Sequence, residues 1–351
     1  MKGEKKMSKK IKWGVIGCGV ISRTHLEGAA MSDCAEVVAV CDIVREKAEE
    51  KARLYDVKKV YTDYKELLAD PEVDAVSVCV PSGLHGEVCI AAAKAKKHIL
   101  CEKPVEITKE KIDAIDKAVK ENGVKLACVF QLRYDEPFQI TKKAVEEGLF
   151  GKPVMASAYL KFNRDQAYYD KDAWRGTWEL DGGGCLMNQG VHGIDIMSWI
   201  LGDVESVFAK CANKVRKGIE VEDTAMALVQ FKNGCIATIE GSTCCYPGMI
   251  ETFEFHFEKG SIIVKDVEGI VEWKLEGADL PMPTWKKVEA VSAKDDPTKV
   301  VSISHYLLIT DLCKAINENT DPFITLDSAR KGVELILAIY ESSQKKQEIF
   351  L

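Results

Sequence analysis

The segment Val15–His25, "VIGCGVISRTH", decides the fold of the first part of the chain. Gly17 and Gly19 occupy the first two positions of a G-x-G-x-x-G pattern. Glycine there permits a tight strand-to-helix turn and lets a pyrophosphate approach the helix N-terminus. Ser22 takes the third position, and its small side chain should still allow the helix to pack closely on the strand. Because the motif alone also fits an ordinary tight turn, the surrounding segments must decide between the two.

Residues 11–130 alternate short apolar runs with patterns of helical period. The runs "IKWGVIG", "EVVAVCD", "VDAVSVCVP", "KHILCEKP" and "VKLACVF" are β-branched and do not alternate with polar residues, as expected of strands buried on both faces. Helices are expected between them, over residues 44–55, 86–95 and 109–121. Strands and helices in this order predict an α/β domain with a doubly wound parallel sheet and right-handed crossovers.

The pattern changes past about Arg133. "ETFEFHFEKGSIIV" alternates phenylalanine with glutamate and histidine before a turn, and "TAMALVQFKNGCIATIEGS" is a second hairpin that turns at Asn233-Gly234. Two amphipathic helices are expected to close the chain, over residues 304–316 and 328–343. We therefore expect two domains, residues 9–130 and residues 131–351, with a cleft between them and a mostly antiparallel sheet in the second.

Composition excludes several classes of partner. The net charge of -7 and the absence of a long basic run argue against nucleic acid or an acidic membrane. Thirteen cysteines are scattered without a CxxC pair, which favours reduced thiols in a cytoplasmic protein and no metal site. Cys244-Cys245 is interpreted as part of a strand, with redox chemistry left open. The first residues have no long apolar segment, so neither a signal peptide nor a membrane anchor is expected.

The second strand ends in "VAVCD", which places Asp42 twenty residues after Ser22. A carboxylate at this position accepts hydrogen bonds from the ribose hydroxyls of a dinucleotide. Its charge would repel a 2′-phosphate, and Ile43 follows where an arginine would bind one, so NAD is favoured over NADP. The alternatives for Asp42 are a helix cap at the strand end or the corresponding acid of a methyltransferase.

A later strand ends in "HILCEKP", at the edge of a parallel sheet where ligands collect. Lys103 in this run could place its ammonium group near a nicotinamide ring and the reacting oxygen. Pro104 restricts the backbone of Lys103 to extended conformations and so limits its direction. The alternative is a solvated lysine that follows a strand.

Residues 186–201 are expected to form a largely buried helix that carries three polar side chains on one stripe. Asn188, His192 and Asp195 lie at i, i+4 and i+7. Burying them unpaired would cost several kcal/mol, so a polar cleft is the favoured environment. A closed hydrogen-bond network is the alternative. The glycines "GGG" before the helix would let its N-terminus approach another backbone or a ligand.

The runs "GCGVIS", "VAVCD", "VPSGLHGE", "CEKP" and "GGGCLMNQGVHGID" resemble, in order and spacing, the Gfo/Idh/MocA oxidoreductases, the glucose–fructose oxidoreductase and inositol dehydrogenase family. The resemblance covers nearly the whole chain. It implies an N-terminal Rossmann domain and a C-terminal α+β domain whose large open sheet forms homodimer or homotetramer contacts. It also implies that Lys103 contacts nicotinamide and substrate and that His192 transfers the proton.

The expected reaction is hydride transfer between NAD and a secondary alcohol, with His192 as base and Lys103 stabilising the alkoxide. Many members of the family have aspartate four residues before the histidine, whereas this chain has Asn188. Asp195 is therefore the favoured residue to support the imidazole of His192. The expected substrate contacts are Lys103, Arg175, Asn188 and His192. The expected cofactor contacts are Gly17, Gly19, Val20, Ile21, Asp42, Pro81, His85, Glu102, Lys103, Gln131, Trp174 and Arg175.

Several interpretations stay open. The substrate is a sugar, a cyclitol or a sugar derivative, including nucleotide-linked ones, for which Arg175 would bind an anionic group and Trp174 or Trp178 would stack on a ring. The loop that carries them could equally be a packed surface loop. An NAD-dependent glycosidase or lyase using transient C3 oxidation is one alternative function, and a non-catalytic dinucleotide-sensing regulator is another. His85 could instead cap its helix, and His305 has no assigned role.

Overall fold

The computed structural model describes residues 9–286 and 302–351. The chain divides into two compact units. The first, called here the Rossmann unit, lies within Met1–Val105, Glu110–Val129 and Val301–Leu326. The second, called the sheet unit, lies within Glu106–Lys109, Phe130–Val300 and Asp327–Leu351.

The Rossmann unit contains a six-stranded parallel sheet in the order β3-β2-β1-β4-β5-β6, which confirms the predicted doubly wound architecture. Its strands are β1 Ile11–Ile16, β2 Ala35–Cys41, β3 Lys59–Tyr61, β4 Ala75–Val78, β5 His98–Cys101 and β6 Leu126–Cys128. The strand order reverses between β1 and β4. In open α/β sheets, ligands bind at the carboxyl ends of the strands beside such a switch point.

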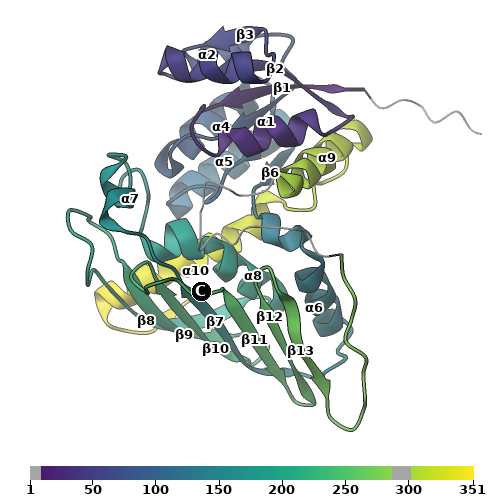
Figure 1. The fold of residues 1–351 in the computed structure, drawn as a ribbon, viewed down its shortest axis with the longest axis vertical. Coiled ribbons are helices and arrows are strands. Elements are labelled where there is room, and N and C mark those ends of the chain that lie inside the picture. The colour runs from purple at the N-terminus through teal and green to yellow at the C-terminus, as the bar shows by residue number, and fades with distance from the viewer. Residues whose placement is uncertain (1–8, 287–301) are drawn as a thin grey trace, which may run out of the picture. The chain divides into compact units, whose positions relative to one another are not determined.

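Helices cover both faces of this sheet: α1 Ser22–Ala30, α2 Arg45–Leu54, α3 Tyr64–Ala69, α4 His85–Lys94, α5 Lys109–Asn122 and α9 Ile303–Glu318 (Figure 1). The three helices predicted before residue 130 are confirmed to within one residue at each end. Two short 3₁₀ turns, η1 Ser82–Leu84 and η2 Gln131–Tyr134, follow β4 and β6.

The predicted domain division differs from the observed one at its C-terminal end. The chain does change unit at Phe130, but residues 302–326 pack with the first unit instead of the second. Ile324 accepts a hydrogen bond from the backbone of Cys128 at 3.2 Å, and the rings of His25 and His305 lie 4.7 Å apart. These long-range contacts dock α9 on α1 and β6, which a sequence-local pattern does not encode.

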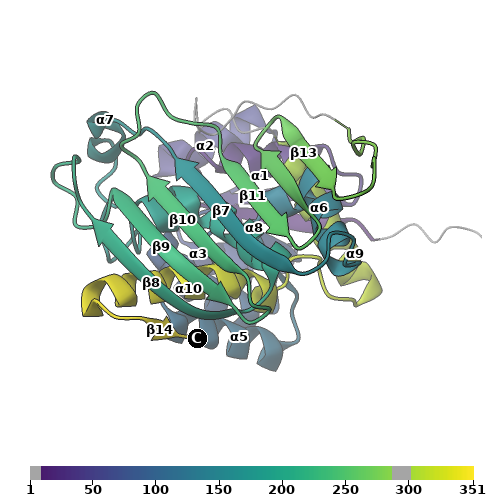
Figure 2. The same ribbon diagram turned by 90° about the horizontal axis from the view of Figure 1, so that it is seen from below.

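The sheet unit contains an eight-stranded sheet in the order β13-β12-β11-β7-β10-β9-β8-β14 (Figure 2). Every neighbouring pair is antiparallel except β7 and β10. Both predicted hairpins are confirmed. The strands are β7 Pro153–Lys161, β8 Val204–Ala212, β9 Thr224–Phe231, β10 Ile236–Ser242, β11 Thr252–Phe257, β12 Gly260–Lys265, β13 Gly269–Leu275 and β14 Ile349–Phe350.

Helices cover one face of this sheet and leave the other open. Behind the strands in Figure 2 lie α6 Glu136–Glu146, α8 Val191–Leu201 and α10 Leu326–Lys345, while α7 Gln166–Asp170 stands beside one end of the sheet. Phe253 and Phe255 point to the covered face and are buried, whereas Met226 and Leu228 on β9 are more than half exposed. The alternation seen in the sequence therefore reflects one packed face and one bare face. Among the described helices, none has the length and apolarity that crossing a bilayer requires.

Candidate active site

The glycine turn between β1 and α1 is shaped as a phosphate cradle. Gly17 has φ +94°, and a Cβ there would lie 2.4 Å from the carbonyl oxygen of Cys79, so only glycine fits. A Cβ at Gly19 would meet nothing within 4 Å. Ser22 stabilises the turn, because its Oγ donates to the carbonyl oxygen of Gly19 at 2.6 Å. The turn is thus closed on the sheet side and open where a diphosphate would approach.

Asp42 follows β2 directly and is half-buried. Its Oδ2 accepts the backbone N–H of Cys18, in the glycine turn, at 2.8 Å. Its Oδ1 accepts the N–H of Val44, at the start of α2, also at 2.8 Å. The carboxylate therefore acts as a cap and ties α2 to the glycine turn. Since a carboxylate offers about four acceptor positions, two stay available for hydroxyl groups.

The "EKP" turn after β5 is held on both sides. The Oε2 of Glu102 accepts the backbone N–H of Lys103 at 3.1 Å, and the Lys103–Pro104 peptide is cis. On the other side, His85 places Nδ1 2.7 Å from the carbonyl oxygen of Pro104 and Nε2 2.9 Å from that of Val80. The buried His85 ring bridges the loop after β4 and the "EKP" turn.

The structure corrects the expectation that Asp195 supports His192. Arg133, in η2, donates from Nε to Oδ2 of Asp195 at 2.8 Å and from Nη2 to Oδ1 at 2.5 Å. Both residues are almost fully buried. Burial raises the pKa of Asp195 to about 6, and the adjacent Arg133 opposes that rise. Asp195 therefore belongs to an ion pair that joins η2 to α8, and Arg133 is the cation of that pair.

The expected single helix over residues 186–201 begins as a different kind of turn. Cys185–Gly190 form one π-helical stretch, and α8 starts only at Val191. Asn188 lies in the π stretch and His192 in the first turn of α8, both half-buried. The ring of His192 stands edge-on to Phe130, with centroids 6.0 Å apart. The polar stripe is therefore divided: Asn188 and His192 keep exposed surface, whereas Asp195 is buried in its ion pair.

Two buried acids that sequence reasoning missed hold this stretch. The Oδ1 of Asp181 accepts Nδ2 of Asn188 at 2.7 Å. Glu222, from the loop before β9, accepts the backbone N–H groups of Gly184 at 2.9 Å and Leu186 at 3.0 Å, and the Tyr340 hydroxyl at 2.9 Å. Burial raises the pKa of Glu222, and these hydrogen bonds oppose the rise. Nothing periodic marks either acid in the sequence.

Of the three glycines before the π stretch, Gly184 is required by the close approach of Glu222. A Cβ on Gly184 would lie 1.7 Å from the carbonyl oxygen of Glu222. The expected close approach is therefore to another backbone segment.

Arg175 is embedded in an aromatic and polar network. Its guanidinium lies 4.2 Å from the ring centroid of Tyr168 and 4.8 Å from that of Trp174. Its Nε donates to Asp172 at 3.0 Å, and its Nη1 donates to the Tyr168 hydroxyl. Gln189 then donates to the same hydroxyl at 2.9 Å and to Oδ1 of Asn188 at 3.4 Å. The structure thus connects Arg175 with Asn188 through two intermediate side chains.

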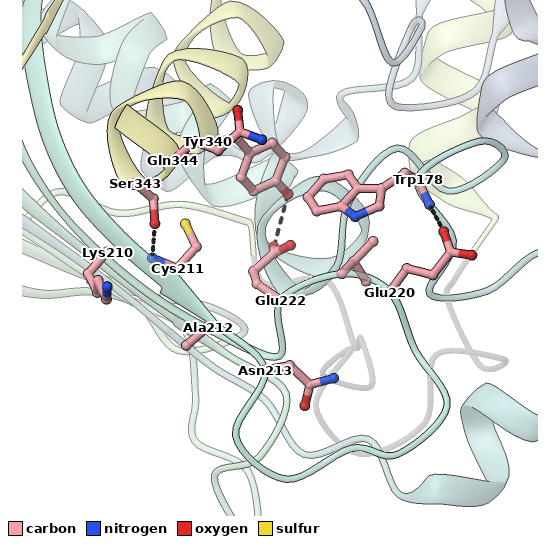
Figure 3. A pocket seen from close by; sticks show the side chains of 11 residues that line it. Trp178, Lys210, Cys211, Ala212, Asn213, Glu220, Glu222, Tyr340, Ser343 and Gln344 are labelled. Atoms are coloured by element: carbon pink, nitrogen blue, oxygen red, sulfur yellow. Dashed lines mark hydrogen bonds between the residues drawn. The ribbon is translucent and has the colours of Figure 1, made fainter. Parts of the chain in front are cut away.

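A cavity of about 620 Å³ opens elsewhere in the sheet unit, and Figure 3 shows its walls. Trp178, which is 46% exposed, packs edge-on against Tyr340, and Glu222 lies beneath them. None of the predicted catalytic residues lines this cavity. Trp178 thus lines a cavity of the sheet unit. Of the remaining predicted contacts, Gln131 keeps a buried Oε1 without a hydrogen-bond partner among the described residues, Val20 is exposed and Pro81 precedes η1.

Comparison with known proteins identifies the family. Residues 11–130 match the model of an oxidoreductase family with an NAD-binding Rossmann fold, GFO_IDH_MocA, and residues 138–263 match the GFO/IDH/MocA C-terminal domain. The chain is 35% identical to myo-inositol 2-dehydrogenase of Thermotoga maritima, over 72% of this chain and 75% of that protein. It is 32% identical to 1,5-anhydro-D-fructose reductase of Ensifer adhaerens, over 73% and 76%.

A solved structure is similar over nearly the full length. The WlbA dehydrogenase from Bordetella pertussis, in complex with NADH and UDP-GlcNAcA, is 32% identical, with a TM-score of 0.87 over 98% of this chain and 99% of that one. The two family models match residues in both units of the fold. The chain belongs to the GFO/IDH/MocA oxidoreductase family and is an NAD-binding dehydrogenase.

Proposed function

We propose that this enzyme oxidises a secondary alcohol of an anionic, nucleotide-linked sugar, with NAD as the hydride acceptor. One observation carries the cofactor part: the glycine turn, Asp42 and the "EKP" turn all follow parallel strands of one sheet at its carboxyl edge. This is where dinucleotides bind in such sheets. When bound, NAD supplies the hydride acceptor, and the protein's residues supply binding, orientation and proton transfer.

Gly17 and Gly19 would cradle the diphosphate, and Val20 and Ile21 continue the same turn. The ribose hydroxyls would donate to Asp42, whose two unused acceptor positions suit a 2′,3′-diol. A 2′-phosphate would meet the same carboxylate, and the next residue, Ile43, is 90% exposed and carries no charge. NAD is therefore preferred to NADP. Replacing Asp42 with serine should weaken that preference by about tenfold, since one charge repulsion is lost.

We assign the proton transfer to His192 and the stabilisation of the alkoxide to Lys103. An imidazole has an unperturbed pKa of about 6.5 and accepts a hydroxyl proton at neutral pH. An ammonium group stabilises the negative charge that develops on the same oxygen. Asn188 would orient a substrate hydroxyl: Asp181 fixes its amide nitrogen, and its Oδ1 accepts from Gln189.

The proposal of an anionic substrate rests on two observations. The WlbA relative, solved with UDP-GlcNAcA, is similar over nearly the whole chain. Arg175 is held by Asp172 and Tyr168 through Nε and Nη1, which leaves Nη2 for a carboxylate or phosphate. A cyclitol is the second candidate, supported by the 35% identity to myo-inositol 2-dehydrogenase.

We further propose a cytoplasmic homo-oligomer that assembles through the bare face of the sheet. Exposed apolar residues lie on four adjacent strands of this face: Met155, Phe208, Met226, Leu228 and Ile236. Two pairs of them are cross-strand partners, Met155 with Ile236 and Phe208 with Leu228. Exposed apolar residues that gather on one face of a sheet are typical of a protein interface. The thirteen free thiols suit a reducing compartment. Leu228→Glu should lower the oligomer mass in light scattering, whereas the exposed control Val267→Glu should not.

The substrate proposal is tested by NADH absorbance after mixing the enzyme with NAD and either UDP-GlcNAcA or myo-inositol, and after mixing it with NADH and 1,5-anhydro-D-fructose. Turnover of the nucleotide sugar, with Arg175→Leu raising its KM at least tenfold, is expected. Turnover of myo-inositol alone would favour the cyclitol. Product formation without accumulated NADH would favour the glycosidase or lyase mechanism. NAD binding without turnover of any compound would favour the regulator.

A further inference from the structure

A buried cluster of two histidines and one glutamate lies directly behind the "EKP" turn. His25, in α1, places Nε2 2.9 Å from Oε1 of Glu102. His305, in α9, places Nε2 3.3 Å from the same oxygen. The side chains of both histidines are at most 1% exposed, and that of Glu102 is 8% exposed. The three residues come from positions 25, 102 and 305 and meet only because α9 packs in the Rossmann unit.

The hydrogen bonds of the cluster determine its charge. Trp13 donates from Nε1 to Oγ of Ser77 at 2.8 Å, and Ser77 lies 2.9 Å from Nδ1 of His25. A neutral His25 with its proton on Nε2 satisfies both of its ring nitrogens, because Ser77 then donates to Nδ1 and Nε2 donates to Glu102. Burial lowers the pKa of His25, which agrees with the neutral form. Burial also opposes ionisation of Glu102, but the two imidazoles outweigh it and hold its pKa well below the usual value.

Glu102 uses its other oxygen on the neighbouring residue. Oε1 contacts the two imidazole rings, whereas Oε2 accepts the backbone N–H of Lys103 at 3.1 Å. A carboxylate anchored at one oxygen and bonded to the next amide with the other restricts the rotation of that peptide unit. The carbonyl of Pro104 is held separately by His85 at 2.7 Å. Lys103 is therefore bracketed by two buried side-chain contacts to the backbone.

The same three residues are also the kind that bind metal ions, but their spacing favours hydrogen bonds. With zinc bonds of about 2.0–2.1 Å, ligand atoms of a tetrahedral site lie about 3.3 Å or more apart. The 2.9 Å between His25 and Glu102 is shorter than that and is an ordinary N–H···O distance. His305 keeps its Nδ1 buried and without a hydrogen-bond partner among the described residues.

We propose that His305 and His25 are positioning residues for Lys103: they hold one oxygen of Glu102 in place, and the other oxygen of Glu102 fixes the backbone that presents the lysine. This inference rests on the role proposed for Lys103. It gives a function to the return of α9 into the Rossmann unit and to His305, the most distant member of the cluster.

Hydrogen exchange tests the geometry without a substrate. The Lys103 amide is measured by mass spectrometry with residue-level fragmentation, in the full-length protein. His305→Leu and Glu102→Gln should each speed its exchange about tenfold or more, because a hydrogen bond to a charged acceptor is lost or loosened. His305→Gln should restore slow exchange, because its amide can donate to Glu102. His98→Leu is the matched control at the other end of β5 and should change nothing.

A double-mutant cycle tests the link to catalysis. With the sugar that the substrate assay identifies, His305→Leu should lower kcat about tenfold while NADH affinity, measured by fluorescence, stays within about twofold. In a Lys103→Ala background His305→Leu should have no further effect, because both act at one point. If the decreases in kcat caused by His305→Leu and Lys103→Ala multiply in the double variant, the proposal is wrong. Unchanged Lys103 exchange in His305→Leu would also overturn it, as would one equivalent of zinc in the purified protein that EDTA removes together with the protection.

The outcomes separate this inference from the proposed function. If Lys103→Ala keeps full turnover, the catalytic assignment fails, whereas the exchange result still reports whether the cluster holds the turn. If Lys103→Ala is inactive but His305→Leu equals the parent enzyme in both exchange and kcat, the assignment stands and the positioning role is wrong.

Discussion

Two buried glutamates, one in each unit, hold the segments that carry the proposed catalytic residues. Glu102 supports the turn with Lys103, and Glu222 supports the start of the stretch with Asn188 and His192. Both are almost fully buried, yet the pKa of Glu102 lies well below its usual value and that of Glu222 lies above it. The partners explain the difference: Glu102 is faced by two histidines, whose rings lower its pKa through hydrogen bonds and electrostatic attraction, whereas backbone amides and a phenol donate to Glu222. Burial alone therefore does not set the charge of a supporting acid.

The largest expected effect comes from removing the residues that these acids support. Lys103→Ala and His192→Ala should each lower turnover by about 10²–10⁴-fold, because each removes a group that acts in the transition state. NADH affinity, measured by fluorescence, should change little in His192→Ala. The exposed Lys109→Ala serves as the control for Lys103. Near-normal turnover in either variant would show that the segment held by the corresponding glutamate does not carry a catalytic residue.

A third buried acid, Asp195, sharpens the contrast because its partner is a permanent cation. Arg133→Leu would leave that carboxylate buried without its guanidinium, and the free energy of unfolding should fall by about 3–5 kcal/mol. Arg133→Leu combined with Asp195→Leu should recover most of the loss, since the unpaired charge is then gone. Urea denaturation measures both. A double variant no more stable than the single one would contradict the ion-pair interpretation.

Glu222 can be weakened in two graded steps. Glu222→Ala leaves the N–H groups of Gly184 and Leu186 without their acceptor and should cost about 1–3 kcal/mol of stability. Glu222→Gln keeps one acceptor oxygen and should cost less, because the pKa of the acid is already raised by burial. Chemical denaturation gives the two values. Equal losses would mean that the negative charge matters here as it does at Glu102.

The smallest expected effect is the pH dependence of stability, and its sign is opposite for the two glutamates. The lowered pKa of Glu102 means that its contribution to stability is present above the unfolded value of about 4.3 and is lost as the pH falls below it. The raised pKa of Glu222 gives the reverse: its contribution is present below the unfolded value and declines as the pH rises through the folded one.

Melting temperatures from about pH 3 to about pH 7 therefore separate the two acids. The deficit of Glu102→Gln relative to the parent should grow as the pH rises, and that of Glu222→Gln should shrink. Deficits that change with pH in the same direction would show that the two acids do not differ in charge state.

Much of the Rossmann unit could be predicted from sequence because its features are local. The turn at Gly17, the acid at Asp42 and the turn at Glu102 each follow a strand within one or two residues. Parallel strands place all their carboxyl ends on one edge, so chain order alone brings these residues to that edge. The hairpins of the sheet unit were predictable for the same reason, since alternation and an Asn-Gly turn are properties of consecutive residues.

The polar stripe shows where local patterns stop. Their spacing predicts that Asn188, His192 and Asp195 share one face of a helix. In the structure the segment begins with a π-helical stretch, and Asp195 pairs with Arg133, 62 residues away in the sequence. Periodicity reports which residues share a face and not which partner occupies it. The predicted support of His192 by Asp195 was therefore wrong, because the true partner of Asp195 lies in a different element, η2.

The sequence by itself determined the class of this protein: two architectures, an NAD-type turn and a dehydrogenase family, all written in residues that are close together in the chain. Only the tertiary structure decided which acids are paired, and it did so through contacts such as those of Glu102 with His305 and of Glu222 with Gly184. Short-range geometry follows from backbone sterics and side-chain pattern. The charge state of a buried group depends on its neighbours in space, and packing alone chooses those neighbours.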